Sequence, residues 1–193
     1  MSLYSYDDRQ LWQTYLSGDN HALGILAERY YRTLRRYGLK FGVDASVAED
    51  CIQDLFLELG QNRHRINDTN SVKFYLLKAL RNNVLQYLRY QQRFLGNDQD
   101  WMPELPDYIN AEALLIEKET LSDSLFQLKT LMETLPKRER EVLYLRYYEN
   151  LSVAEISEIM GINRQSVSNF LQKALSKLRT KWLVTMVLYL NIF

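Results

Sequence analysis

Five polar side chains between residues 164 and 173 are of the types that read the edges of DNA bases. They are Arg164, Gln165, Ser168, Asn169 and Lys173, and they fall at the N-terminal end of an expected helix. Gln and Asn side chains pair with adenine edges, Arg pairs with guanine, and Lys contacts phosphate. This combination predicts a surface that recognises double-stranded DNA in the major groove.

The element that must position these side chains is predicted to be a helix-turn-helix. Ser152 with Glu155 three residues later forms a capping box, and Gly161 favours the left-handed conformation that ends a helix. Asn163 is suited to cap a second helix, whose apolar residues recur every three or four positions: Val167, Leu171, Ala174 and Leu178. A helical hairpin used only for packing is the alternative, and the capping signals with the polar outer face favour DNA binding.

A second candidate nucleic-acid surface lies on the basic segment 71–93, which is expected to form one long helix. Its buried stripe repeats every fourth residue: Val72, Leu76, Leu80, Val84 and Leu88. The remaining faces interleave Tyr87 and Tyr90 with basic residues: Lys73, Lys78, Arg81, Arg89 and Arg93. Cations that follow phosphates beside rings that stack on bases are typical of binding to single-stranded or melted nucleic acid. A solvated helix with its rings in the core explains this stretch equally well.

The expected helix 46–59 carries the opposite charge. Ser46 and Glu49 predict a capping box at its start. Its apolar stripe is Cys51, Ile52, Leu55, Phe56 and Leu59, and its polar face is Glu49, Asp50, Gln53, Asp54 and Glu58. An acidic face repels DNA but can dock a basic protein partner. A solvated face is the simpler interpretation of this stretch taken alone.

Catalytic patterns are not recognisable in the sequence. His21 and His64 lie in unrelated contexts without other ligands at metal-binding spacing, and no phosphate-binding Gly-rich loop or nucleophile motif occurs. We therefore expect a binding protein that is not an enzyme, with no metal, no cofactor and no small-molecule substrate.

The patterns predict an all-α protein of two small helical domains joined by an acidic linker. The expected domains are 1–95 and 116–182, with the linker at 96–115 and an apolar C-terminal tail at 183–193. The formal net charge is zero, yet 61–95 carries +6 (seven Lys/Arg, one Asp) and 96–133 carries −7 (two Lys, nine Asp/Glu). One cysteine and no signal-peptide pattern favour a cytoplasmic location, and the apolar tail is shorter than the ~20 residues that span a bilayer.

Taken together, the motifs resemble the sigma-70 family of bacterial RNA polymerase sigma factors, in its extracytoplasmic-function (ECF) group. Gly18-Asp19-Asn20-His21-Ala22-Leu23 resembles the opening of the family's region 2, and Asp50-Cys51-Ile52-Gln53-Asp54-Leu55-Phe56 resembles its acidic docking segment. The stretch from Tyr75 to Arg89 resembles the family's Trp-Leu-x-x-Ile-Ala-x-Asn-x-x-x-Asp-Tyr-Leu-Arg signature. The stretch from Leu135 to Arg179 resembles region 4.

The resemblance implies a role for each block. Asp50, Gln53, Asp54 and Phe56 would bind core RNA polymerase, with contacts to its β′ and β subunits. A second group would bind the −10 element and the melted strand of promoter DNA: Arg65, Lys73, Lys78, Asn82 and Arg89. Arg164, Gln165, Ser168, Asn169 and Lys173 would read the −35 element. The sub-branch that the chain resembles is controlled by membrane-bound anti-sigma factors, so such a regulator is a further expected partner.

The sequence departs from the family pattern at several positions. Tyr75 stands for the signature Trp and Gln86 for its Asp, and the segment 166–170 lacks two common positive charges. Two other functions stay open. A stand-alone helix-turn-helix regulator would form a dimer on palindromic DNA, and a helical protein–protein adaptor would use the same helices without DNA.

Overall fold

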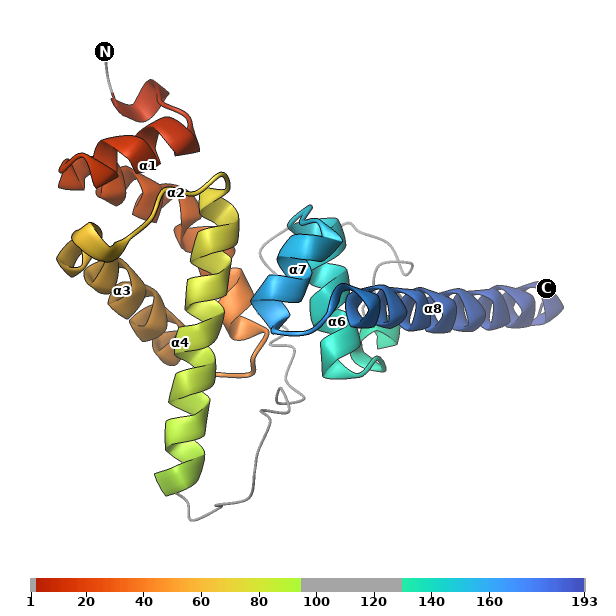
Figure 1. Cartoon of the computed structure of the whole chain (residues 1–193). Helices are drawn as coiled ribbons and strands as arrows, with labels where there is room; N and C mark the ends of the chain where they lie inside the picture. The colour runs from red at the N-terminus through yellow and green to blue at the C-terminus, as the bar shows by residue number, and fades with distance from the viewer. Residues whose placement is uncertain (1–2, 95–129, 193) are drawn as a thin grey trace. The chain divides into compact units, whose positions relative to one another are not determined.

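A computed structural model describes residues 3–94 and 130–192, with side chains described through 93 in the first range and 180 in the second. The described residues form helices and turns, without a strand among them. This agrees with the all-α class expected from the sequence. The chain divides into two compact units, Met1–Tyr108 and Ile109–Phe193, and each is described by itself (Figure 1). The expected linker 96–115 and the start of the second domain at 116 lie outside the described residues.

Unit 1 is a bundle in which α2 packs against each of the other α-helices. In chain order the unit comprises η1 (Leu3–Ser5), α1 (Asp8–Leu16), α2 (Asn20–Leu39), α3 (Ala45–Gln61), η2 (Arg63–Arg65) and α4 (Val72–Phe94). Large side chains fill the space between them: Trp12, Tyr15, Leu26, Leu34, Tyr37, Leu55, Leu76 and Leu80 are at most 2% exposed. Burial of aliphatic and aromatic side chains on this scale is the main stabilising term of such a bundle.

Local hydrogen bonds fix where these helices begin. Asp7 and Gln10 form a capping box at α1, with the Gln10 N–H donating to Asp7 Oδ1 at 2.8 Å. Asp19 Oδ1 accepts from the His21 N–H at 2.8 Å at α2. At α4, Ser71 Oγ accepts from the Phe74 N–H at 3.2 Å, which places the start within one residue of the expected one.

The capping box predicted at Ser46 and Glu49 is wrong. Helix α3 begins at Ala45 with Asp44 at the N-cap position, and no side chain caps it. Glu49 instead accepts a hydrogen bond from Arg35 Nε of α2 at 2.8 Å. An ion pair between neighbouring helices has replaced the local hydrogen bond that the sequence pattern indicated.

Unit 2 contains α6 (Lys137–Leu143), the π-helical turn η4 (Tyr144–Tyr148), α7 (Val153–Met160) and α8 (Arg164–Ile192). Leu135, Leu143 and Ala174 form a buried cluster, against which Met132, Leu171 and Leu178 pack. Pro136 sits at the N-cap of α6, one residue before the first-turn position expected for it. Helix α8 extends to Ile192, so most of the expected tail 183–193 belongs to this helix, while its side chains lie outside the described residues.

The helix-turn-helix predicted from the sequence is confirmed in its details. Ser152 and Glu155 form the capping box of α7. Gly161 ends that helix in the left-handed conformation, at φ 65°. Asn163 Oδ1 accepts from the Ser166 N–H at 2.7 Å and so caps α8. Helices α7 and α8 pack against each other, and α8 also packs on α6.

Candidate functional site

The five candidate base-reading residues all project into solvent from the first turns of α8. Arg164, Gln165, Ser168, Asn169 and Lys173 are exposed, whereas Val167 and Ala174 on the opposite side are fully buried. Gln165 Nε2 donates to Asn169 Oδ1 at 3.1 Å. This bond uses neither the Asn169 amide N–H groups nor the Gln165 carbonyl oxygen, and both residues are exposed. An amide pair so arranged presents both a donor and an acceptor, as the edge of adenine requires.

Helix α8 is held in place by a charged contact to α6. Lys177 Nζ donates to both carboxylate oxygens of Glu139, at 2.8 and 3.0 Å. The side chain of Glu139 is only 5% exposed, and that of Lys177 is 45% exposed. The ammonium group of Lys177 therefore neutralises a buried carboxylate of its own unit.

The basic candidates of unit 1 do not share a single face. Lys78, Asn82 and Arg89 follow one side of α4, where Asn82 and Arg89 are exposed and Lys78 lies 5.4 Å from the centroid of the Phe74 ring. Lys73 is nine residues before Asn82, which is two and a half turns at about 3.6 residues per turn. It therefore lies on the opposite side of the helix, where it is half-buried.

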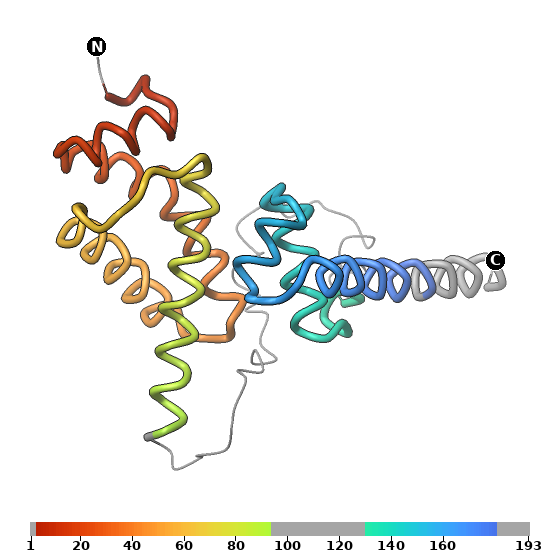
Figure 2. The backbone as a smooth tube through the Cα atoms, in the orientation of Figure 1, coloured from red at the N-terminus to blue at the C-terminus, as the bar shows by residue number. Residues whose placement is uncertain are grey.

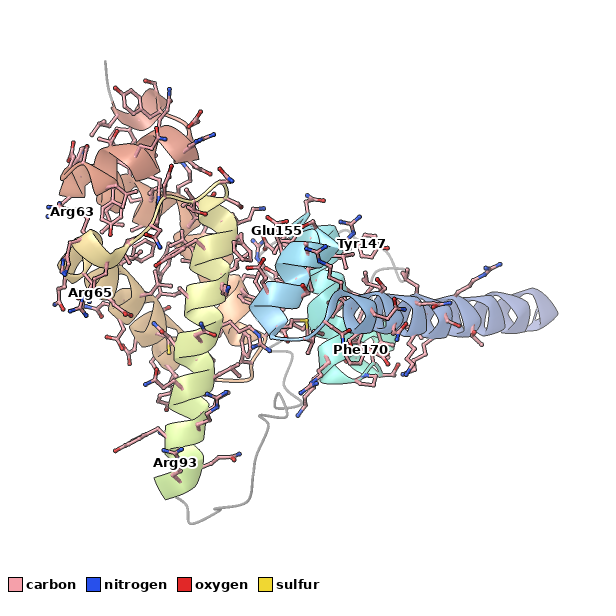
Figure 3. All side chains as sticks on the ribbon, in the orientation of Figure 1. Arg63, Arg65, Arg93, Tyr147, Glu155 and Phe170 are labelled. Atoms are coloured by element: carbon pink, nitrogen blue, oxygen red, sulfur yellow. The ribbon has the colours of Figure 1, made fainter. Side chains whose placement is uncertain are left out.

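Arg65 comes from a different element, the short helix η2. It is exposed, and Figure 3 shows it away from α4. The backbone that connects it to α4 crosses beside α1 and α2 (Figure 2). Arg65 and the exposed face of α4 therefore flank the segment 66–71.

The acidic candidates lie on the exposed side of α3. Asp50, Gln53 and Asp54 are exposed, and their spacing of three and four residues places them on one face. Phe56, the fourth candidate, is half-buried and lies to one side of this face. Leu57 is 51% exposed and continues the same face, four residues after Gln53 and seven after Asp50. Leu57 was not among the candidates expected from the sequence, although that same spacing could have found it.

The neighbouring ionisable groups keep the charge of this helix well defined. The hydrogen bond from Arg35 lowers the pKa of Glu49, so its carboxylate stays ionised and paired with α2. Burial raises the pKa of the Cys51 thiol, and Asp54 and Asp50 raise it further. Cys51 is therefore a neutral side chain packed in the core, as its place on the apolar stripe indicates.

In the part of the chain that the structure describes, no three or more His, Cys, Asp or Glu side chains lie close enough together to hold a metal ion. Within the same residues, no helix has the length and apolar character needed to cross a membrane.

Comparison with known proteins identifies both units. The family model for sigma-70 region 2 matches residues 26–94, and the model for sigma-70 region 4 matches residues 125–178. The chain belongs to the sigma-70 family. The first match covers α3, η2 and α4 with most of α2, and the second covers the helix-turn-helix, so every candidate site residue lies inside one of them.

Individual sigma-70 family members resemble most of the chain. The ECF RNA polymerase sigma factor SigL of Mycobacterium tuberculosis is 29% identical over 160 residues, which are 80% of this chain and 85% of that protein. SigZ of Bacillus subtilis is 21% identical over 154 residues, covering 80% and 83% of the two chains. The ECF membership expected from the sequence is confirmed.

Solved structures share the fold. CnrH, solved in complex with the cytosolic domain of CnrY, has a TM-score of 0.60 at 20% identity and covers 91% of this chain and 96% of its own. The sigma factor RpoE of Bartonella quintana, solved with the anti-sigma factor NepR, has a TM-score of 0.55 at 18% identity, covering 77% and 88%.

Proposed function

We propose that three surfaces of this sigma factor divide the tasks of promoter recognition. The exposed face of α3 docks on core RNA polymerase. Arg65, the segment 66–71 and the exposed face of α4 bind the −10 element and its melted strand. The exposed face of α8 reads the −35 element. In this scheme the protein catalyses no reaction itself, and the polymerase performs the chemistry.

The observation that carries the proposal is the opposite charge of the exposed faces on α3 and α4 of the same bundle. Asp50 and Asp54 on α3 would repel DNA phosphates, so that face needs a partner other than DNA. Lys78, Arg89 and Arg93 on α4 are suited to phosphates, with the 67%-exposed ring of Tyr90 beside them. A small domain with both faces can bridge a basic protein surface and a nucleic acid, which a plain DNA-binding domain does not need to do.

The division of labour on α8 follows from side-chain chemistry. Asn169 and Gln165 present hydrogen-bonding groups for base edges, and Arg164 is placed at the helix N-terminus for guanine or phosphate. Lys173 lies further along the helix, where a flexible ammonium group is suited to phosphate. Both β′ and β are the expected polymerase contacts, and the cytoplasm is the compartment where polymerase and promoter meet.

A protein regulator is a further expected partner. CnrH was solved with the cytosolic domain of CnrY and RpoE with the anti-sigma factor NepR. We infer that this chain is also controlled by an anti-sigma factor, and the membrane-bound type that the sequence suggests is the specific form proposed.

The test is a binding assay with purified core RNA polymerase. The double variant Gln53→Ala/Asp54→Ala should lose polymerase binding, because it removes two polar groups from the centre of the docking face. Glu28→Ala is the matched control: Glu28 is an exposed carboxylate on α2, outside that face, and its removal should leave binding unchanged.

Two results would contradict the proposal. Equal polymerase binding by the double variant and the wild type would remove α3 from the interface. Tight binding of a palindromic duplex by a dimer of the free chain would favour the stand-alone regulator instead.

A further inference from the structure

We propose that α1 and the turn between α1 and α2 act as a brace for the segment 62–71, with Trp12 and Arg63 as positioning residues for capture of a −10 base. This inference rests on the proposed role of that segment in −10 recognition. No residue of α1 was a candidate in the sequence, and both Trp12 and Arg63 lie far along the chain from the residues they contact.

Trp12 contacts both the middle of the segment and the helix that follows it. Its side chain is fully buried, and its Nε1–H donates to the backbone oxygen of Asn67 at 3.4 Å. The same indole packs on Tyr75 in the first turn of α4, with ring centroids 5.0 Å apart. One rigid side chain of α1 thus fixes a backbone carbonyl of the loop relative to the helix that the loop enters.

The helix that precedes the segment is held from the same element. The hydroxyl of Tyr15 donates to the backbone oxygen of Leu59 at 2.7 Å, in the last turn of α3. Burial raises the pKa of this hydroxyl, with Tyr75 raising it further and Arg63 lowering it, so it remains a donor at neutral pH. The ring of Trp12 lies 5.3 Å from that of Tyr15, so the two anchors support each other.

Arg63 joins the segment to the turn between α1 and α2. Its Nη1 donates to Asn20 Oδ1 at 3.4 Å, and its guanidinium lies beside Gly18. A Cβ at Gly18 would stand 3.8 Å from Nη1, and the φ of 124° at this position also disfavours other residues. Figure 3 shows Arg63 at the end of α1 and Arg65 apart from it. The two arginines therefore have different tasks: Arg63 holds the segment, and Arg65 is left exposed for DNA.

The physical consequence is preorganisation. A loop that is anchored at Arg63 and Asn67, and whose flanking helices are held by the same element, has less conformational freedom to lose when a flipped base enters it. Loosening one anchor should therefore reduce the contribution of the captured base to binding, while the other surfaces of the protein keep theirs.

The test uses the holoenzyme, assembled from core polymerase and the full chain, with forked promoter DNA. Each −10 base is replaced in turn by an abasic site, and the ratio of affinities for intact and abasic DNA is measured. Trp12→Phe keeps a buried ring but removes the N–H donor. At the position of the captured base, we expect Trp12→Phe to lower this ratio by about 3- to 10-fold, the range for a single hydrogen bond. Core affinity, −35 duplex affinity and far-UV helicity should stay at wild-type values.

The variant Arg65→Ala distinguishes a failure of the brace proposal from a failure of the −10 role on which it rests. If this variant loses base discrimination while Trp12→Phe keeps it fully, the brace is wrong and the −10 role of the segment stands. If Trp12→Phe weakens binding of intact and abasic DNA equally, Trp12 supports folding only and the proposal also fails. If the wild type does not distinguish intact from abasic DNA at any −10 position, the −10 role and the brace are overturned together.

Discussion

Leu57 is an apolar side chain on an otherwise polar face of α3. It is 51% exposed, one turn after Gln53 and two turns after Asp50. Side chains that a partner desolvates, with polar side chains around them, contribute most to protein interfaces. Phe56, half-buried in unit 1 itself, has less surface left for a partner.

We therefore predict that Leu57→Ser weakens core polymerase binding by about four- to tenfold, the loss expected when the exposed half of an aliphatic side chain no longer becomes buried. Leu57→Met, which keeps the apolar volume, should bind within a few-fold of wild type. Surface plasmon resonance on immobilised core enzyme measures both. Unchanged affinity of Leu57→Ser would place the interface elsewhere.

The exposed polar residues of α8 should separate into two kinds. Asn169→Ala removes a group that contacts a base edge. It should weaken binding of the cognate −35 duplex by about 1–3 kcal/mol and relax specificity at one base-pair position. Lys173→Ala removes a phosphate contact and should weaken binding to all DNA sequences alike. It should also reduce the slope of the logarithm of the binding constant against the logarithm of salt concentration by about 1. Anisotropy of the holoenzyme on duplexes changed one base pair at a time, at several salt concentrations, distinguishes them. A uniform loss for Asn169→Ala would assign it to the DNA backbone.

At the scale of elements, α8 depends on its contact to α6. Lys177 neutralises the buried Glu139 at 2.8 Å. Lys177→Met should lower the free energy of unfolding of unit 2 by about 1–3 kcal/mol, because it leaves a buried carboxylate without its donor. We expect the lower end of this range, since solvent screens the half-exposed ammonium group.

Lys173→Met is the matched control, being an exposed lysine of the same helix and nearly the same position. Native-state hydrogen exchange of α6 and α8 should show reduced protection in Lys177→Met alone, while Lys173→Met should affect DNA binding alone. Equal protection in both variants would mean that the ion pair makes no net contribution.

The elements that could be predicted from the sequence are those determined by neighbouring residues. The capping box of α7, the left-handed Gly161 and the Asn163 cap each depend on residues within four positions of one another, and all three are confirmed. The every-fourth-residue stripe of α4 likewise follows from helix geometry. Val72, Leu76, Leu80 and Val84 are buried as expected, whereas Leu88, nearer the end of the helix, is only half-buried.

The features that could not be predicted depend on residues distant in the chain. Glu49 pairs with Arg35 rather than with the start of its own helix, and Lys177 pairs with Glu139 38 residues away. In each case the deciding partner is set by packing, which no local pattern contains.

At the scale of the whole molecule, the formal net charge is zero although the charges lie in blocks of opposite sign. A neutral protein has little long-range attraction for DNA, since steering follows the summed field. The acidic face of α3 and the acidic stretch 96–133 oppose the basic face of α4. Bound to polymerase, α3 would be covered and its charge neutralised by the partner.

The free chain should therefore bind promoter DNA weakly, and the holoenzyme strongly. We expect the free chain to show micromolar or weaker affinity near physiological salt, in the range typical of non-specific binding (Kd about 10⁻⁴–10⁻⁶ M), and little preference for promoter over random duplex. Adding core polymerase should produce promoter-specific binding, tighter than random DNA by about a thousandfold or more. Anisotropy titrations of one labelled promoter with free chain, core enzyme and both together measure this. Nanomolar, promoter-specific binding by the free chain would mean that the surfaces on α4 and α8 act without polymerase, and the charge balance of the molecule would then need a different explanation.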